Sequence, residues 1–87
     1  MVQHLNLETM SKRNLDNDLK KLIKKLYGSQ LNCSIELGVT SQSVHNWHTS
    51  NPRSMLKYAP EIVANKNITW TQLAGEVLAR ENELQNG

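Results

Sequence analysis

The sequence has little of several residue types that particular functions require. Its 87 residues include no phenylalanine, one cysteine, two prolines and four glycines. A single cysteine, Cys33, excludes an intramolecular disulfide and fits a reducing compartment. No apolar run approaches the ~18 residues that span a bilayer, and the first residues lack the basic-then-apolar order of a secretory signal. We therefore expect a cytoplasmic protein without a membrane segment.

Charge is distributed unevenly, although the net charge is only +2. From Lys12 to Lys57 the chain has eight basic and three acidic residues, whereas residues 58–87 have two basic and four acidic ones. A basic front and a mildly acidic back favour an oriented approach to a polyanion. The alternative is a solvated lysine face, since Lys24 and Lys25 also complement the dipole of the first expected helix.

Hydrophobic spacing predicts an all-α fold, a compact bundle of about five short helices. The expected helices cover approximately residues 15–27, 30–37, 41–48, 55–65 and 70–82. Asn14 is the expected N-cap of the first helix, and Thr69 with Gln72 forms a capping box before the fifth. Leu5 and Leu7 alternate with polar neighbours, so residues 1–9 could form a short strand or an arm.

The fourth expected helix contains a proline whose effect depends on where the helix starts. The preceding segment, TSNPRS, is expected to be a loop because Asn-Pro favours a turn. Pro60 is tolerated if the helix starts near Lys57, since the first backbone N–H groups have no partner within a helix. A start at Ser54 instead predicts a kink or break at Tyr58 to Ala59.

Each expected helix has a stripe of side chains that should face the core. In the second helix these are Leu31, Ser34 and Ile35, with Cys33 as a further candidate. The other expected inward residues are Leu15, Leu19, Leu22, Ile23, Leu26, Val44, Trp47, Leu56, Ala59, Ile62, Val63, Trp70, Leu73, Ala74, Val77 and Leu78.

The second and third expected helices flank one glycine with the spacing of a helix-turn-helix. Gly38 supplies a turn residue without Cβ strain, and Val39 returns the chain to the core. Ser34 provides the small side chain needed where the helices cross. Val44 and Trp47, three residues apart, anchor the later helix and leave its other faces polar.

These residues carry a resemblance to a known group. GSQLNCSIELGVTSQSVHNW resembles the helix-turn-helix of phage Cro and repressor proteins (lambda-repressor-like), including Cro-like antitoxins. LKYAPEIVANKNITWTQLAGE is similar to their later helices. The resemblance covers roughly Leu15 to Leu78 and is tightest from Gly28 to Trp47. We expect a helix-turn-helix DNA-binding domain over residues 14–82, with an N-terminal arm at 1–13 and a C-terminal tail at 83–87. Trp47 is bulkier than the usual Ile or Leu, and Ser34 replaces the typical alanine, so the crossing angle should differ slightly.

The resemblance also implies roles for individual side chains. In such proteins the later helix of the motif lies in the major groove. The positions that read base edges there are Ser41, Gln42, His45 and Asn46. The positions near the DNA backbone are Gln30, Thr40, Ser43, Arg53, Lys57, Lys12 and Arg13. Simpler roles remain open for three of these: Thr40 as a helix N-cap, Ser43 as a solvated side chain, and Gln30 as an ordinary first-turn residue.

We therefore expect a sequence-specific double-stranded DNA-binding regulator, a Cro-like repressor of phage or mobile-element type in a bacterial cytoplasm or nucleoid. It should bind a pseudo-palindromic operator as a homodimer, with half-sites ~34 Å apart. A regulatory protein partner is left open. The alternative is a protein-interaction or RNA-binding helical module, similar to an antitoxin or antirepressor, in which the motif is a scaffold.

An enzyme is the other rival interpretation. His45 and His48 are three residues apart and could ligate a metal. However, Cys33 should face the core, and no acidic residue lies between Glu36 and Glu61. We therefore expect no catalytic residue, no metal site and no cofactor.

Overall fold

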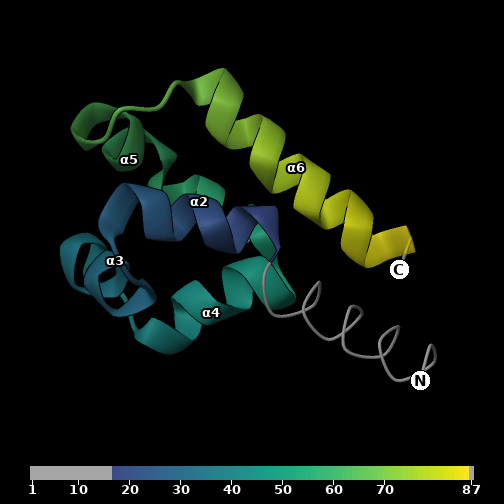
Figure 1. Ribbon diagram of the computed structural model, residues 1–87, viewed down its shortest axis with the longest axis horizontal. Coiled ribbons are helices and arrows are strands. Elements are labelled where there is room, and N and C mark those ends of the chain that lie inside the picture. Colours follow the sequence, from purple (N-terminus) through teal and green to yellow (C-terminus); the bar gives the residue numbers. More distant parts are fainter. Residues whose placement is uncertain (1–16, 87) are drawn as a thin grey trace, which may run out of the picture.

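Short helices alternate with turns through residues 17–86, the part of the chain that the computed structural model describes (Figure 1). They are α2 (Asp18–Tyr27), α3 (Gln30–Leu37), α4 (Ser41–Thr49), the 3-10 helix η1 (Pro52–Tyr58), α5 (Ala59–Asn65) and α6 (Trp70–Asn86). No strand occurs between residues 17 and 86, so the predicted all-α class is confirmed there. The possible strand or arm at residues 1–9, together with Lys12, Arg13, Asn14 and Leu15, lies outside the described residues.

The first described helix begins three residues later than the sequence predicted. Asn17 has extended backbone angles (φ −78°, ψ 167°), and its side chain accepts a hydrogen bond of 2.9 Å from the backbone N–H of Lys20. It is therefore the N-cap, and α2 begins at Asp18. The helix buries Leu19, Ile23 and Tyr27, and its C-cap is Gly28, which has a positive φ of 90°.

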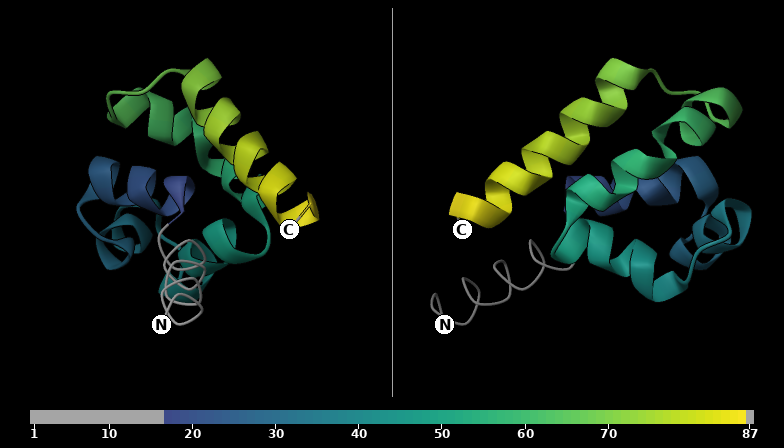
Figure 2. Two further views of the ribbon diagram at one scale, coloured as in Figure 1. Left: turned by 45° about the vertical axis from the view of Figure 1, so that its right-hand side comes forward. Right: turned by 180° about the vertical axis from the view of Figure 1, so that it is seen from behind.

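One hydrophobic core joins all the elements. Its buried side chains are Leu19, Ile23, Tyr27, Cys33, Leu37, Val44, Trp47, Met55, Ala59, Ile62, Leu73 and Val77. Figure 1 shows α2 in the middle of the bundle, with α3 and α4 along one edge and α6 along the other. The two further views show the same order, with the C-terminal half of α6 converging on α4 (Figure 2).

Four large apolar side chains that were predicted to face inward are on the surface. Leu31 and Ile35 are 62% and 67% exposed, because the row of α3 that holds Cys33 and Leu37 faces the core and lies opposite. In α6 the buried row is Leu73, Val77 and Arg80. Trp70 is 50% exposed at the start of the helix. Leu78 is 44% exposed, because it follows Val77 in the sequence and therefore points to a different side of the helix.

The predicted fourth helix is two elements rather than one. The 3-10 helix η1 covers Pro52–Tyr58 and α5 covers Ala59–Asn65, so the break falls at Tyr58 to Ala59, as expected for an early start. Pro60 lies in the first turn of α5, where its missing N–H costs no hydrogen bond. The expectation of a loop through Pro52 was wrong, because the buried Pro52 opens η1 and Met55 anchors it in the core.

The capping box at the start of α6 is confirmed. The Thr69 N–H donates to Gln72 Oε1 at 3.0 Å, and the Gln72 N–H donates to Thr69 Oγ1 at 3.1 Å. The helix continues to Asn86 instead of ending near Asn82. Side-chain contacts one turn apart support the extension, including Asn86 Nδ2 to Asn82 Oδ1 at 2.9 Å. None of the helices in residues 17–86 combines the length and apolar composition needed to cross a membrane.

Candidate functional site

The turn between α3 and α4 depends on a left-handed glycine. Gly38 has φ 70° and ψ 33°, and its N–H donates to Ile35 O at 3.3 Å. The next N–H, of Val39, donates to Ser34 O at 2.9 Å. These bonds satisfy the last carbonyls of α3, and a side chain at position 38 would strain the backbone. The turn therefore directs the chain from α3 into α4 within three residues.

The five residues predicted to build this pair of helices are brought together. Ser34 is 3% exposed, and its hydroxyl donates to Leu31 O at 2.6 Å, so its small polar side chain is buried without an unpaired donor. Val44 and Trp47 are 0% and 2% exposed. Val39 is partly buried against the same core. Trp47 also packs on Tyr58 of η1, with ring centroids 5.4 Å apart.

The N-terminal end of α4 is capped by its own neighbours. Thr40 is extended (φ −80°, ψ 155°), and its Oγ1 accepts a hydrogen bond of 3.0 Å from the Ser43 N–H. The two hydroxyls also lie 2.9 Å apart. The predicted N-cap role of Thr40 is confirmed, and Ser43 takes part in the same cap.

The outward face of α4 carries the four candidate base-reading residues. Ser41, Gln42, His45 and Asn46 are all exposed. Gln42 Nε2 donates to Asn46 Oδ1 at 3.0 Å, one helical turn apart. This bond leaves the Gln42 carbonyl oxygen and the Asn46 amide hydrogens free for other partners. The pair therefore presents one acceptor and one donor group side by side.

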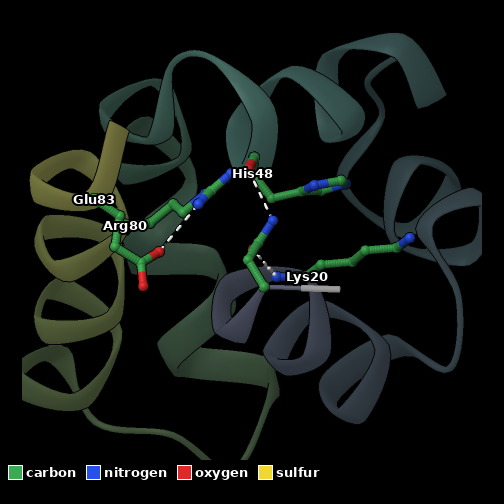
Figure 3. Close-up of polar contacts among 5 residues, drawn as sticks. Lys20, His48, Arg80 and Glu83 are labelled. Carbon is green, nitrogen blue, oxygen red and sulfur yellow. Dashed lines mark hydrogen bonds and ion pairs between the residues drawn. The ribbon is translucent and has the colours of Figure 1, made fainter. Parts of the chain in front are cut away.

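The C-terminal end of α4 is held by distant parts of the chain, which the sequence did not predict. The carbonyl of His48 accepts a 2.7 Å hydrogen bond from Arg80 Nε of α6 and a 3.1 Å bond from Asn17 Nδ2 (Figure 3). Arg80 is 9% exposed and also donates to Glu83 Oε1 at 3.0 Å. No local pattern marks Arg80, because its partner lies 32 residues away in the chain.

The imidazole of His48 is buried beneath the candidate face. It is 1% exposed, and Nε2 lies 2.8 Å from Gln30 Oε1. Since an amide oxygen only accepts, neutral His48 carries its proton on Nε2. Within the described part of the chain Nδ1 is buried without a partner. Burial, followed by the positive charges of His45, Lys20 and Arg80, lowers the His48 pKa to about 4.

The amide of Gln30 is thereby oriented by the ring of His48. Its oxygen is occupied by the histidine, so its NH₂ group is the part that remains for another acceptor. Gln30 stands at the first position of α3. Ser29 caps this helix, because its Oγ accepts a 3.0 Å hydrogen bond from the Asn32 N–H, so the Gln30 and Leu31 N–H groups are the ones left without a helical partner. This geometry is compatible with an anion beside the start of α3.

A polar hollow of about 270 Å³ continues from the face of α4 into η1. It is lined by Ser43, Asn46, Trp47, Ser50, Asn51 and Ser54. Sequence reasoning missed Ser50, Asn51 and Ser54, because this segment was interpreted only as a connecting loop. Their concentration of serine and asparagine directly after the candidate helix was the signal that could have found them.

The basic candidates differ in their surroundings. Arg53 of η1 forms an ion pair with Glu81 of α6, and this hydrogen bond raises the pKa of Arg53 above its usual value. Lys57 is exposed. The remaining two, Lys12 and Arg13, lie outside residues 17–86. The element η1, which contributes Ser54 to the lining of the hollow, therefore carries two cationic side chains.

Residues 17–86 hold no group of three or more His, Cys, Asp and Glu side chains arranged for a metal ion. Comparison with protein-family models, with curated proteins and with solved structures gave no match for this chain.

Proposed function

We propose that the chain is a sequence-specific double-stranded DNA-binding regulator. In this proposal α3 and α4 form a helix-turn-helix, and α4 lies in the major groove. The observation that carries it is the division of α4 into two faces. Val44, Trp47 and His48 are buried, whereas Ser41, Gln42, His45 and Asn46 are exposed and uncharged or weakly basic.

The chemistry of the exposed face suits base edges better than phosphates. In the major groove adenine offers N7 as acceptor and the N6 amino group as donor. The Gln42–Asn46 pair presents an amide NH₂ and an amide oxygen, which match that order. Ser41 can serve either base of a pair, and His45 can donate to an acceptor such as guanine N7 or O6.

Backbone contacts would come from the margins of this face. On one side of the groove, a phosphate would meet the Gln30 amide and the Gln30 and Leu31 N–H groups, which the Ser29 cap leaves free. On the other side, a phosphate would meet the polar hollow after α4. Arg53 and Lys57 would add sequence-independent, salt-sensitive attraction. Thr40 and Ser43 would lie at the groove margin.

A single motif of this kind reads few base pairs. We therefore propose a homodimer on a pseudo-palindromic operator, with half-sites ~34 Å apart, acting as a Cro-like repressor of phage or mobile-element type. A dimer would also add buried surface to a small domain.

In-vitro selection of bound duplexes from a random pool tests this function. We expect an enriched, pseudo-palindromic sequence whose binding weakens steeply with salt. Gln42→Ala should relax the preference at one base pair by about 1–3 kcal/mol. Gln85→Ala, which changes an exposed glutamine of α6, is the matched control and should leave the preference unchanged. No enrichment, or a preference for single-stranded RNA of equal length, would contradict the proposal.

The second candidate function is a protein-interaction module. It is favoured by Leu31 and Ile35, two large apolar side chains that share one exposed face of α3. In that case the double substitution Leu31→Ser and Ile35→Ser would abolish the protein's regulatory activity in the cell, whereas its affinity for duplex DNA would stay unchanged. Under the DNA-binding proposal, substitutions on α4 have the larger effect on activity.

A further inference from the structure

The ion pair between η1 and α6 connects a candidate DNA contact to a carboxylate. The Arg53 side chain is 63% exposed, whereas that of Glu81 is 22% exposed. Arg53 Nε donates to Glu81 Oε2, and among residues 17–86 the guanidinium makes no other hydrogen bond. The carboxylate thus holds the guanidinium through Nε and leaves its two Nη groups available.

Glu81 is itself fixed relative to α4. Its neighbour in the sequence, Arg80, donates to the carbonyl of His48 near the end of α4. Two consecutive residues of α6 therefore contact the two elements that line the polar hollow: Arg80 contacts α4, and Glu81 contacts η1. Because Arg80 is buried in this contact, the Glu81 carboxylate is attached to a well-held part of the helix.

We infer that Glu81 is a positioning residue for DNA binding: it holds the Arg53 guanidinium so that its Nη groups can donate to a backbone phosphate beside α4. This inference rests on the proposed function. A long arginine side chain loses rotamer freedom when it binds, and an arginine that is already oriented loses less. The negative charge of Glu81 acts in the opposite direction, because it repels the same phosphate.

Two variants separate orientation from charge. Glu81→Gln and Glu81→Ala remove the same charge, but only glutamine keeps a side-chain oxygen that can accept from Arg53 Nε. Dissociation constants for one duplex are measured at several salt concentrations. We expect the alanine variant to bind roughly two- to fivefold more weakly than the glutamine variant. The difference should disappear when both are combined with Arg53→Ala.

Matched controls come from the same helix. Glu76 lines a groove between α2 and α6, away from Arg53, so Glu76→Gln and Glu76→Ala should bind duplex equally. Thermal unfolding of every variant checks that the fold is retained. In the free protein, the Arg53 Nε–H resonance should exchange slowly with water in the wild type and in Glu81→Gln, and faster in Glu81→Ala.

Equal affinity of the two Glu81 variants overturns the inference, as does a difference that persists without Arg53. Both of these results leave the proposed function intact. A wild-type protein that binds no duplex in a salt-dependent way removes the proposed function instead, and the positioning role with it.

Discussion

The two ends of α4 are held in different ways. At the N-terminal end, Thr40 and Ser43 cap the helix with their own side chains. At the C-terminal end, the carbonyl of His48 accepts hydrogen bonds from Asn17 and Arg80, which are 31 and 32 residues away in the chain. The first end is a local property of neighbouring residues, whereas the second exists only once α2, α4 and α6 have packed together.

This difference bears on how the candidate face is placed. A local cap determines where α4 begins, but it does not determine how the helix lies against the rest of the protein. The bonds to His48 do so, because they connect the last turn of α4 to the start of α2 and to the second half of α6 (Figure 3). The orientation of the exposed face therefore depends on residues outside the α3–α4 pair.

The largest expected effect on stability comes from a substitution at the C-terminal end of α4. Arg80→Met keeps the aliphatic stem but removes a charged donor from a buried carbonyl, which should cost about 2–3 kcal/mol of unfolding free energy. The midpoint of thermal unfolding should fall by roughly 10–20 °C. Glu83→Gln, which loses only the exposed partner of Arg80, is the control and should change stability by less than about 0.5 kcal/mol. Equal effects of the two variants would contradict this role for Arg80.

A slightly smaller loss of unfolding free energy is expected when Asn17, which has two roles, is replaced. Asn17→Ala should cost about 2 kcal/mol, because it removes the cap of α2 and the bond to His48 together. Asn17→Ser retains a capping oxygen but cannot reach His48, so it should cost about half as much. Denaturant unfolding measures both. If serine restores full stability, the contact between α2 and α4 contributes nothing.

Acid should weaken the packing at the C-terminal end of α4, where His48 is buried. The pKa of His48 is lowered to about 4 in the folded protein, chiefly by burial and then by His45, Lys20 and Arg80, against ~6.5 in the unfolded chain. As the pH falls, the unfolded state therefore binds the proton before the folded state does. The contribution of neutral His48 to the free energy of unfolding is complete above about pH 6.5 and is lost as the pH falls toward about 4.

Thermal unfolding at several pH values measures that loss. Between about pH 6.5 and pH 5, before most carboxylates titrate, it should be on the order of 1 kcal/mol. His48→Gln, whose amide can still donate to Gln30, should remove this part of the pH dependence. A variant with an unchanged pH profile would show that His48 is not the group responsible.

The smallest effect is expected at the local end. Thr40→Ala removes the cap of α4 and should cost about 0.5–1 kcal/mol, toward the lower part of the usual range because the cap is exposed to water. Thr40→Ser keeps the oxygen and should be close to neutral. Circular dichroism during urea unfolding distinguishes the two. If Thr40→Ala lowered the free energy of unfolding more than Arg80→Met does, the local cap would be the stronger of the two attachments of α4, contrary to this prediction.

The features predicted well from the sequence were those that depend on neighbouring residues. The caps at Thr40 and Thr69 and the turn at Gly38 each follow from residues within one turn of helix. The break before Ala59 was one of two outcomes that the sequence left open for Pro60, and the structure shows that one. The burial of Val44 and Trp47 followed from their spacing next to that turn. These signals also placed Ser41, Gln42, His45 and Asn46 on one exposed surface.

The features that were missed depend on how helices rotate when they pack. Leu31 and Ile35 form a regular apolar pair, but the core selected the opposite row of α3. Arg80 has the sequence context of a surface residue, and only the approach of α6 to α4 buries it. His48 was considered as a metal ligand, whereas its ring is packed beneath the exposed face and bonded to Gln30. Periodicity predicts which residues share one face of a helix, but it does not predict whether that face turns toward the core.

The two tryptophans of this chain occupy opposite environments, which gives the protein an internal optical probe. Trp47 is 2% exposed and lies against Tyr58, while Trp70 is 50% exposed at the start of α6. Replacing Trp70 by phenylalanine would leave a single indole whose fluorescence reports on the underside of α4 alone. If Tyr27 is also replaced by phenylalanine, energy transfer from Tyr58 to Trp47 would then report on the packing of α4 against η1, without any attached label.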